Sequence, residues 1–346
     1  MAETPATIDT PMGGLKKADW IARLAEITEE AGYLEPLGKR HLAAFIDEGS
    51  TLLVTFESLA GIQALSENGH PLGWELVRRH GWSHLCLIAD GDTWFRDRRI
   101  WGYFDRLIDD GFFEDFDRVV FYGAGPCGYA AAAYSVVAPG ATVLVVQPQA
   151  TLDPRITEWD DRFRDQRRLD FNSRFGYAPD MLDAAAKAFV LYDPAEKLDA
   201  MHAALFTRPN VEKFRLRHMG DALQTELLAM DLLRPLLEMA AADTLNTHSF
   251  AQQYRIRRDH PAYLRNLLTE IDGRARPGLA VLLCRNAVAR MNAPRLRRRL
   301  DMLEKAAAEG RFRIPPPAMV GIHTNSLGAA RIWRALMANS RGASAS

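Results

Sequence analysis

The chain has 346 residues and a mass of 38.7 kDa, with 48% hydrophobic and 25% charged residues, which is an ordinary globular composition. No apolar run approaches the roughly 18 residues that a membrane span requires, and the N-terminus has no basic-then-apolar signal pattern. We therefore expect a cytoplasmic protein with no membrane partner. Its three cysteines, Cys86, Cys127 and Cys284, are too few and too scattered to predict a disulfide framework or a zinc site.

The charge is divided unevenly along the chain. Residues 251–346 hold 18 Lys+Arg against 6 Asp+Glu, whereas residues 1–250 hold 25 against 38. Halves of opposite sign predict two units that attract each other, within one chain or between copies in a homo-oligomer. The basic half is alternatively a surface for an anionic partner.

The first predicted elements are a helix and a hairpin. Residues 15–31 carry apolar side chains at helical spacing. Two apolar runs, 41–46 and 51–57, flank the polar turn "DEGS", which predicts a β-hairpin.

Helices and strands then alternate. A strand at 118–122, a glycine turn, an Ala-rich helix at 129–137 and a strand at 142–146 form a β-turn-α-β unit, which implies parallel pairing. The pattern predicts an α/β fold with a doubly wound, mostly parallel sheet and an N-terminal hairpin. The other expected elements are helices at 75–81, 102–113, 202–206 and 222–240, strands at 83–90 and 211–220, and a helix followed by a strand within 181–194.

After residue 242 the strand pattern stops, and helices separated by Pro and Gly follow. We therefore expect an all-helical C-terminal appendage. The predicted divisions are a disordered N-terminus at 1–14, an α/β domain at 15–242, a basic helical appendage at 243–314, and a linker, short helix and tail at 315–346.

The turn "GAGPCG" has two incompatible interpretations. In the first, Gly123, Gly125 and Gly128 fit the G-x-G-x-x-G dinucleotide fingerprint, and the N–H groups at the helix start could hold a pyrophosphate. The turn resembles that of flavin-dependent oxidoreductases, which implies FAD or NAD(P). Gln147 stands where the ribose-binding acid should be, and several strands precede the turn, so this pattern is incomplete.

In the second interpretation the turn is a nucleophile elbow, G-x-Nuc-x-G, which follows several earlier strands as this one does. Five stretches of the sequence bear on this interpretation: "LLVTFE", "GDTWFRDR", "GAGPCGYAAA", "VVQPQATLDPRITEWDDRF" and "YDPAEKLDAMHAAL". In this order they resemble α/β-hydrolases of the serine esterase type, whose elbow runs Gly-Ser-Ser-Met-Gly-Gly-Tyr-Ala-Ala. The resemblance covers roughly residues 40–240.

The resemblance implies a degenerate site. The nucleophile position falls on Gly125, which has no side chain to attack a carbonyl. The family's acid falls at Asp193 (or Asp199), and its histidine position falls on Asp221, with His218 three residues earlier. Cys127 is a substitute nucleophile only if the helix dipole lowers the pKa of its thiol. A small buried side chain is the simpler interpretation.

Chains like this one are also associated with phosphoadenosine phosphosulfate reductase, an assignment that the residues contradict. The Ser-Gly-Gly-x-Asp-Ser phosphate loop and the Glu-Cys-Gly-x-His motif of that class are both missing.

Three functions remain open. We favour a catalytically degenerate protein that binds a small molecule or a protein partner through the old pocket. The alternatives are a hydrolase or acyltransferase that uses Cys127, Asp193 and His218, and an FAD- or NAD(P)-dependent oxidoreductase.

Overall fold

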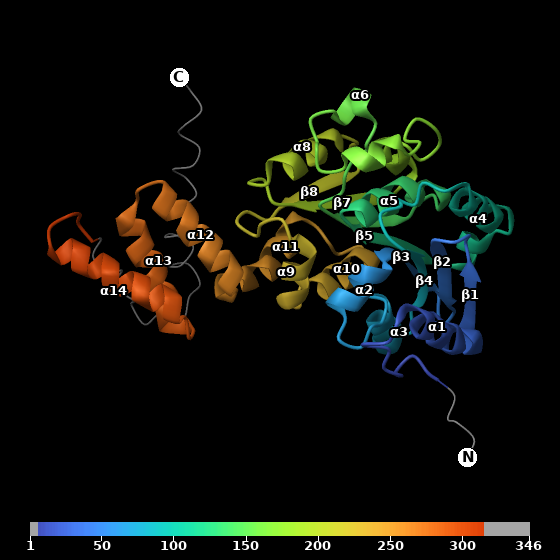
Figure 1. The fold of residues 1–346 in the computed structure, drawn as a ribbon, viewed down its shortest axis with the longest axis horizontal. Helices are drawn as coiled ribbons and strands as arrows, with labels where there is room; N and C mark the ends of the chain where they lie inside the picture. Colours follow the sequence, from blue (N-terminus) through green and yellow to red (C-terminus); the bar gives the residue numbers. More distant parts are fainter. Residues whose placement is uncertain (1–5, 315–346) are drawn as a thin grey trace, which may run out of the picture. The chain divides into compact units, whose positions relative to one another are not determined.

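The computed structural model describes residues 6–314 and divides into two compact units between Thr269 and Glu270. The first unit is built on an eight-stranded sheet with the order β1-β2-β4-β3-β5-β6-β7-β8 (Figure 1). The strands are β1 (Gly32–Pro36), β2 (His41–Ile46), β3 (Thr51–Ser58), β4 (Ser83–Ala89), β5 (Arg118–Ala124), β6 (Thr142–Val146), β7 (Lys187–Tyr192) and β8 (Val211–Arg215).

Strands β1 and β2 are antiparallel to each other, and β2 is antiparallel to β4. Every other neighbouring pair in this sheet is parallel. The predicted doubly wound, mostly parallel α/β sheet with a C-terminal helical region is therefore confirmed.

The predicted hairpin between residues 41–46 and 51–57 is wrong. β2 and β3 do not pair with each other, because β4 lies between them and pairs with both. All seven residues of β4 are buried, so this apolar strand occupies the interior of the sheet and needs a neighbour on each side. An N-terminal hairpin does exist, but it consists of β1 and β2, with Glu35 opposite Ala43.

Helices cover both faces of the sheet because side chains along each strand alternate between them. On one face, Leu85 and Leu87 of β4 belong to the core that includes the side chains of α4 (Arg98–Asp109) and α5 (Pro126–Tyr134). On the other face, Cys86 and Ile88 pack with α1 (Lys17–Ala31) and α3 (Trp74–His80).

The remaining helices of the first unit lie in the connections and after the last strand. They are α2 (Leu59–Leu65), α6 (Pro154–Thr157), α7 (Ala178–Met181), α8 (Lys197–Leu205), α9 (Leu223–Ala229), α10 (Leu233–Ala241) and α11 (Thr247–Gln253), followed by α12 (Pro261–Gly273), which crosses the division. Short 3-10 turns are Phe112–Asp115, Ser135–Val137, Arg164–Arg168, Leu182–Ala184 and Tyr254–Asp259.

Residues 6–14, for which the composition suggested disorder, belong to the first unit and contact its residues 68–70. Met12 is buried, and its N–H donates to the carbonyl oxygen of Asn68 at 2.8 Å. The imidazole Nε2 of His70 lies 2.8 Å from the carbonyl oxygen of Thr10.

The first unit extends beyond the expected boundary at residue 242. Phe250 of α11 stacks on Phe214 of β8 with ring centroids 4.1 Å apart and an interplanar angle of 4°. The second unit contains the end of α12 with α13 (Pro277–Arg290) and α14 (Pro294–Ala308). The linker and short helix predicted at 315–346 lie outside the described residues.

No helix between residues 6 and 314 combines the length and apolarity that crossing a membrane would require.

The Phe214–Phe250 stack predicts a stability difference between two variants of α11. Phe250→Ala removes a buried aromatic ring and should lower the free energy of unfolding by about 3 kcal/mol. Gln253→Ala, at an exposed position of the same helix, should change it by less than about 0.5 kcal/mol. Urea denaturation measures both, and equal effects would contradict the packing of α11 against the sheet.

Candidate functional site

The turn between β5 and α5 is sharp, and Gly125 lies at its apex. Gly125 has φ 55° and ψ −126°, a left-handed conformation that favours glycine. Its N–H donates to the carbonyl oxygen of Val146 at 2.8 Å, and its own carbonyl accepts from the N–H of Tyr129 at 2.9 Å. The apex is therefore tied to the neighbouring strand β6 and to the first turn of α5.

The other two glycines of the turn allow close backbone packing. A Cβ atom at Gly123 would lie 2.1 Å from the carbonyl oxygen of Cys127, and one at Gly128 would lie 3.1 Å from the carbonyl oxygen of Gly123. A Cβ atom at Gly125 would meet nothing within 4 Å. The turn thus projects one position into open space, as a nucleophile elbow does, and glycine occupies that position.

Asp193, the predicted acid, follows β7 and is almost fully buried. Its Oδ1 accepts from the N–H of Ala195 at 2.8 Å, and its Oδ2 accepts from the N–H groups of Met219 and Gly220 at 2.8 and 2.9 Å. The carboxylate therefore stabilises the loop after β8, which contains His218.

His218 lies in this loop with φ 67°. Its ring meets Tyr263 edge-on at 6.1 Å between centroids, and its carbonyl oxygen accepts from Asn266 at 3.0 Å. The structure thus brings His218 and Asp193 to one loop region, whereas Cys127 lies at the start of α5 and lines a separate cavity.

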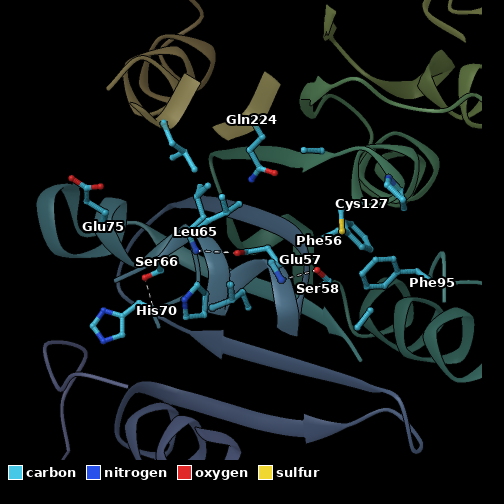
Figure 2. A pocket seen from close by; sticks show the side chains of 18 of the residues that line it. Phe56, Glu57, Ser58, Leu65, Ser66, His70, Glu75, Phe95, Cys127 and Gln224 are labelled. Atoms are coloured by element: carbon cyan, nitrogen blue, oxygen red, sulfur yellow. Dashed lines mark hydrogen bonds between the residues drawn. The ribbon is translucent and has the colours of Figure 1, made fainter. Parts of the chain in front are cut away.

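That cavity has a volume of about 650 Å³ and opens beside the elbow. Its walls come from the ends of β3 and β4, from α2 and α3 with the segment between them, from residues 124, 126 and 127 of the elbow, and from α9. Figure 2 shows Glu57, Cys127 and Gln224 among the side chains that line it, with Phe56 and Phe95 next to Cys127. A volume of this size is typical of sites for small organic molecules.

The thiol of Cys127 is weakly acidic at this position. Burial, followed by the negative charge of Glu57, raises its pKa to about 12. The thiolate is the nucleophilic form of cysteine, so the group is protonated at neutral pH. Burial outweighs the helix-dipole effect that the sequence suggested.

Glu57, which the sequence patterns did not single out, provides a carboxyl group of the cavity lining. Its Oε1 accepts from the hydroxyl of Thr55 at 2.8 Å and from the thiol of Cys86 at 3.4 Å. The N–H of Leu72 donates to both oxygens, at 3.1 and 3.2 Å. Burial raises the pKa of Glu57, and these hydrogen bonds oppose the rise. The only signal in the sequence was one acidic residue closing an otherwise apolar strand.

Glu57, His84 and Cys86 place a carboxylate oxygen, an imidazole nitrogen and a sulfur within 4.8 Å of one another. The hydroxyl of Thr55 already joins two of them, because it donates to Glu57 and lies 2.9 Å from Nε2 of His84. Burial lowers the pKa of His84 to about 3, so its ring is neutral. The hydrogen bonds with Thr55 engage Oε1 of Glu57 and Nε2 of His84, whereas the buried Nδ1 of His84 makes no hydrogen bond within residues 6–314.

Gln147, the residue at the ribose-binding position, uses its side chain inside the protein. Its Nε2 donates to Asp199 Oδ2 at 2.6 Å, and its Oε1 accepts from the N–H of Leu223 at 2.9 Å. Gln147 has φ 48°, so the chain turns sharply after β6. These bonds join the ends of β6, α8 and α9 and leave the amide little capacity for a ribose hydroxyl.

A buried His–Asp pair lies next to this amide and was also missed. Nε2 of His202 lies 2.8 Å from Asp160 Oδ2, and Nδ1 accepts from the N–H of Ala150, so Nε2 carries the proton. Arg162 binds both Asp160 and Asp199. Both members of the pair are fully buried, so it supports the loop after β6 and is not exposed to a substrate.

The basic helices of the second unit are partly neutralised within that unit. Arg285 binds Glu304, and Arg299 binds Asp272, both at 2.8 Å. Arginines 295, 297 and 298 are exposed on α14. An anionic partner for this surface remains a prediction.

No protein-family model and no curated protein matches the chain. Several solved structures show a distant likeness. A carboxyl esterase from the fungus Tuber melanosporum aligns at 12% identity with a TM-score of 0.38, over 60% of this chain and 82% of that one. A fluorophosphonate-binding serine hydrolase from Staphylococcus aureus aligns at 11% and 0.38, over 58% and 94%. An esterase from the archaeon Pyrobaculum calidifontis aligns at 13% and 0.39, over 61% and 84%.

The fold of the first unit is α/β-hydrolase-like. This assignment rests on the strand order, on the antiparallel start of the sheet and on the sharp strand-to-helix turn of this chain itself. The fold alone does not define a reaction, which depends on the residues at the site.

The close packing of the turn predicts unequal costs for two Gly→Ala changes. Gly123→Ala should lower the free energy of unfolding by at least about 2 kcal/mol, because its Cβ would overlap the carbonyl of Cys127. Gly102→Ala, on the exposed face of α4 with nothing within 4 Å, should raise it by about 0.5–1 kcal/mol. Chemical denaturation of both variants measures the difference, and a neutral Gly123→Ala would contradict the described turn.

The raised pKa of Cys127 predicts slow alkylation at neutral pH. Its thiolate fraction at pH 8 should be about 10³-fold below that of free cysteine, and iodoacetamide labelling should rise about tenfold per pH unit without a plateau below pH 10. Mass spectrometry of the Cys127 peptide, with glutathione as the reference thiol, follows the rate. A plateau near pH 7 would instead indicate an activated nucleophile.

Proposed function

We propose that this protein is a catalytically degenerate member of the α/β-hydrolase-like class that binds a small molecule in the cavity beside the elbow. The observation that carries the proposal is the apex of the turn. Gly125 has the backbone conformation and the open space of a nucleophile position, but no side chain. Scaffolds of this class supply chemistry through that one side chain, so its loss leaves a preformed pocket without a nucleophile.

The electrostatics of the cavity support the same proposal. Acyl transfer develops negative charge on an oxyanion, which hydrolases stabilise with N–H donors at the elbow. Glu57 lies at that end of the cavity, and within residues 6–314 it makes no ion pair with a Lys, Arg or His. A carboxylate there would repel an oxyanion and oppose the reaction.

The two alternative functions have less support. A hydrolase or acyltransferase using Cys127 needs a thiolate, which burial disfavours, and a free carboxylate at Asp193, whose oxygens accept backbone N–H groups. An FAD- or NAD(P)-dependent oxidoreductase needs a ribose ligand, but the amide of Gln147 bonds to Asp199 and Leu223. A protein partner and a homo-oligomer remain predictions.

Restoring the missing side chain tests the proposal. Gly125→Ser should turn over p-nitrophenyl acetate within about twofold of the wild type, and a fluorophosphonate probe should label neither protein, because nothing within 4 Å of a Cβ at residue 125 could act as its base. Gly125→Ala is the matched control for backbone strain at φ 55°. Rates are followed by absorbance and labelling by mass spectrometry.

Two outcomes would contradict these expectations. Wild-type turnover that Cys127→Ala abolishes would overturn the proposed function. Turnover gained only in Gly125→Ser would show that residue 125 alone accounts for the lost activity, and would refute the electrostatic argument.

A further inference from the structure

The cavity lining includes three polar groups from separate elements. Glu57 on β3, Cys127 on α5 and Gln224 on α9 all line the cavity (Figure 2). Tyr122 on β5 is not part of this lining, and its buried hydroxyl lies near Gln224, whose side chain lowers the pKa of the phenol by hydrogen bonding while burial raises it.

Glu57 has acceptor capacity left. Its Oε1 already receives hydrogen bonds from Thr55, Leu72 and Cys86. Its Oε2 receives a single bond, from the N–H of Leu72 at 3.2 Å. A carboxylate oxygen accommodates about two donors, so Oε2 can accept another.

Glu57 also has no countercharge. All its hydrogen-bond donors are neutral, and none of the ion pairs within residues 6–314 includes it. Burying a carboxylate without a cation is unfavourable, and the raised pKa of Glu57 reflects that cost. A bound cation would relieve it.

The cavity lining as a whole is negative. Its acidic residues are Glu57, Glu67, Glu75 and Asp92, and its permanently basic residues are Arg78 and Arg79. Arg79 binds Glu75 at 2.8 Å, and Arg78 donates to the carbonyl of Ile8 outside the cavity lining. Burial lowers the pKa of His70, which keeps it neutral at pH 7. Such a lining favours cations over anions.

We propose that the cavity binds a small organic molecule through a primary ammonium group, with Oε2 of Glu57 as its anionic partner. The side-chain oxygen of Gln224 is a further acceptor in the lining, and the ammonium has three protons to donate. Phe56 and Phe95, whose ring centroids lie 4.9 Å apart in an edge-on arrangement, line the cavity next to Cys127 (Figure 2). The apolar part of the ligand lies along Ile62, Leu65 and Leu228.

This inference deepens the proposed function and rests on it, because it names the ligand class of the same cavity. It also separates this cavity from an esterase pocket. A pocket that stabilises an oxyanion needs donors and positive potential, whereas this one presents acceptors and negative potential.

Three soluble probes of similar size test the proposal by isothermal titration of the full-length protein: phenethylamine, phenethyl alcohol and phenylacetate. Phenethylamine should bind at least about tenfold more tightly than phenethyl alcohol, because the ammonium pairs with Glu57. Phenylacetate should show no binding up to about 10 mM.

Variants locate the binding group. Glu57→Gln keeps the size of the side chain and should weaken phenethylamine binding at least about tenfold, to the level of the alcohol. Glu67→Gln, the matched control, removes another acid of the same cavity and should change affinity less than about twofold. Gln224→Lys places a cation opposite Glu57 and should abolish phenethylamine binding, which keeps the test valid if Glu57→Gln fails to fold.

The outcomes separate the inference from the proposed function. The ammonium site would be overturned, and a binding cavity left, if phenethyl alcohol or phenylacetate bound more tightly than phenethylamine. Equal loss of phenethylamine affinity in Glu57→Gln and Glu67→Gln would have the same meaning. Failure of all three probes to bind would overturn both. Ester turnover by the wild type would overturn the proposed function but would leave the cation preference measurable.

Discussion

The structure depends on the contact between the backbone of Gly123 and the carbonyl of Cys127. Only glycine permits this approach, since a Cβ atom would lie 2.1 Å from that oxygen. The contact draws the start of α5 against the end of β5, and the bond from Gly125 to Val146 fixes the turn to β6. As a result Cys127 reaches the cavity while residue 125 projects into open space. The same constraint that shapes a nucleophile elbow therefore persists here without a nucleophile.

The polar groups of Asp193 and Glu57 have hydrogen-bond partners within the protein. The carboxylate of Asp193 accepts hydrogen bonds from three backbone N–H groups, and two of these bonds position the loop after β8. The carboxylate of Glu57 accepts hydrogen bonds from a hydroxyl, a thiol and a backbone N–H, but within residues 6–314 it makes no ion pair. These contacts explain how the fold is retained while the electrostatics of the cavity are opposite to those of an ester-cleaving site.

Local patterns predicted the parallel part of the sheet well, because a strand, glycine turn, helix and strand in succession admit essentially one handedness and one pairing. They failed where pairing is not local. The turn at residues 47–50 carries a hairpin signal, but β4 enters between the two flanking strands from further along the chain. Likewise, the loss of strand signals after residue 242 suggested a new domain, whereas the stacking of Phe250 on Phe214 attaches α11 to the sheet. Neither long-range contact has a signature in a short sequence window.

The sequence by itself determined the class of the fold, the sharp turn at residues 123–128 and the absence of a side chain at its apex, because glycine spacing and strand–helix alternation are local properties of the backbone. Only the tertiary structure decided the chemistry of the cavity. Glu57, Cys127 and Gln224 come from three elements up to 167 residues apart, and burial raises the pKa values of Glu57 and Cys127. Desolvation arises only when the chain has folded, so the negative, ammonium-binding character of this cavity has no counterpart in the linear pattern.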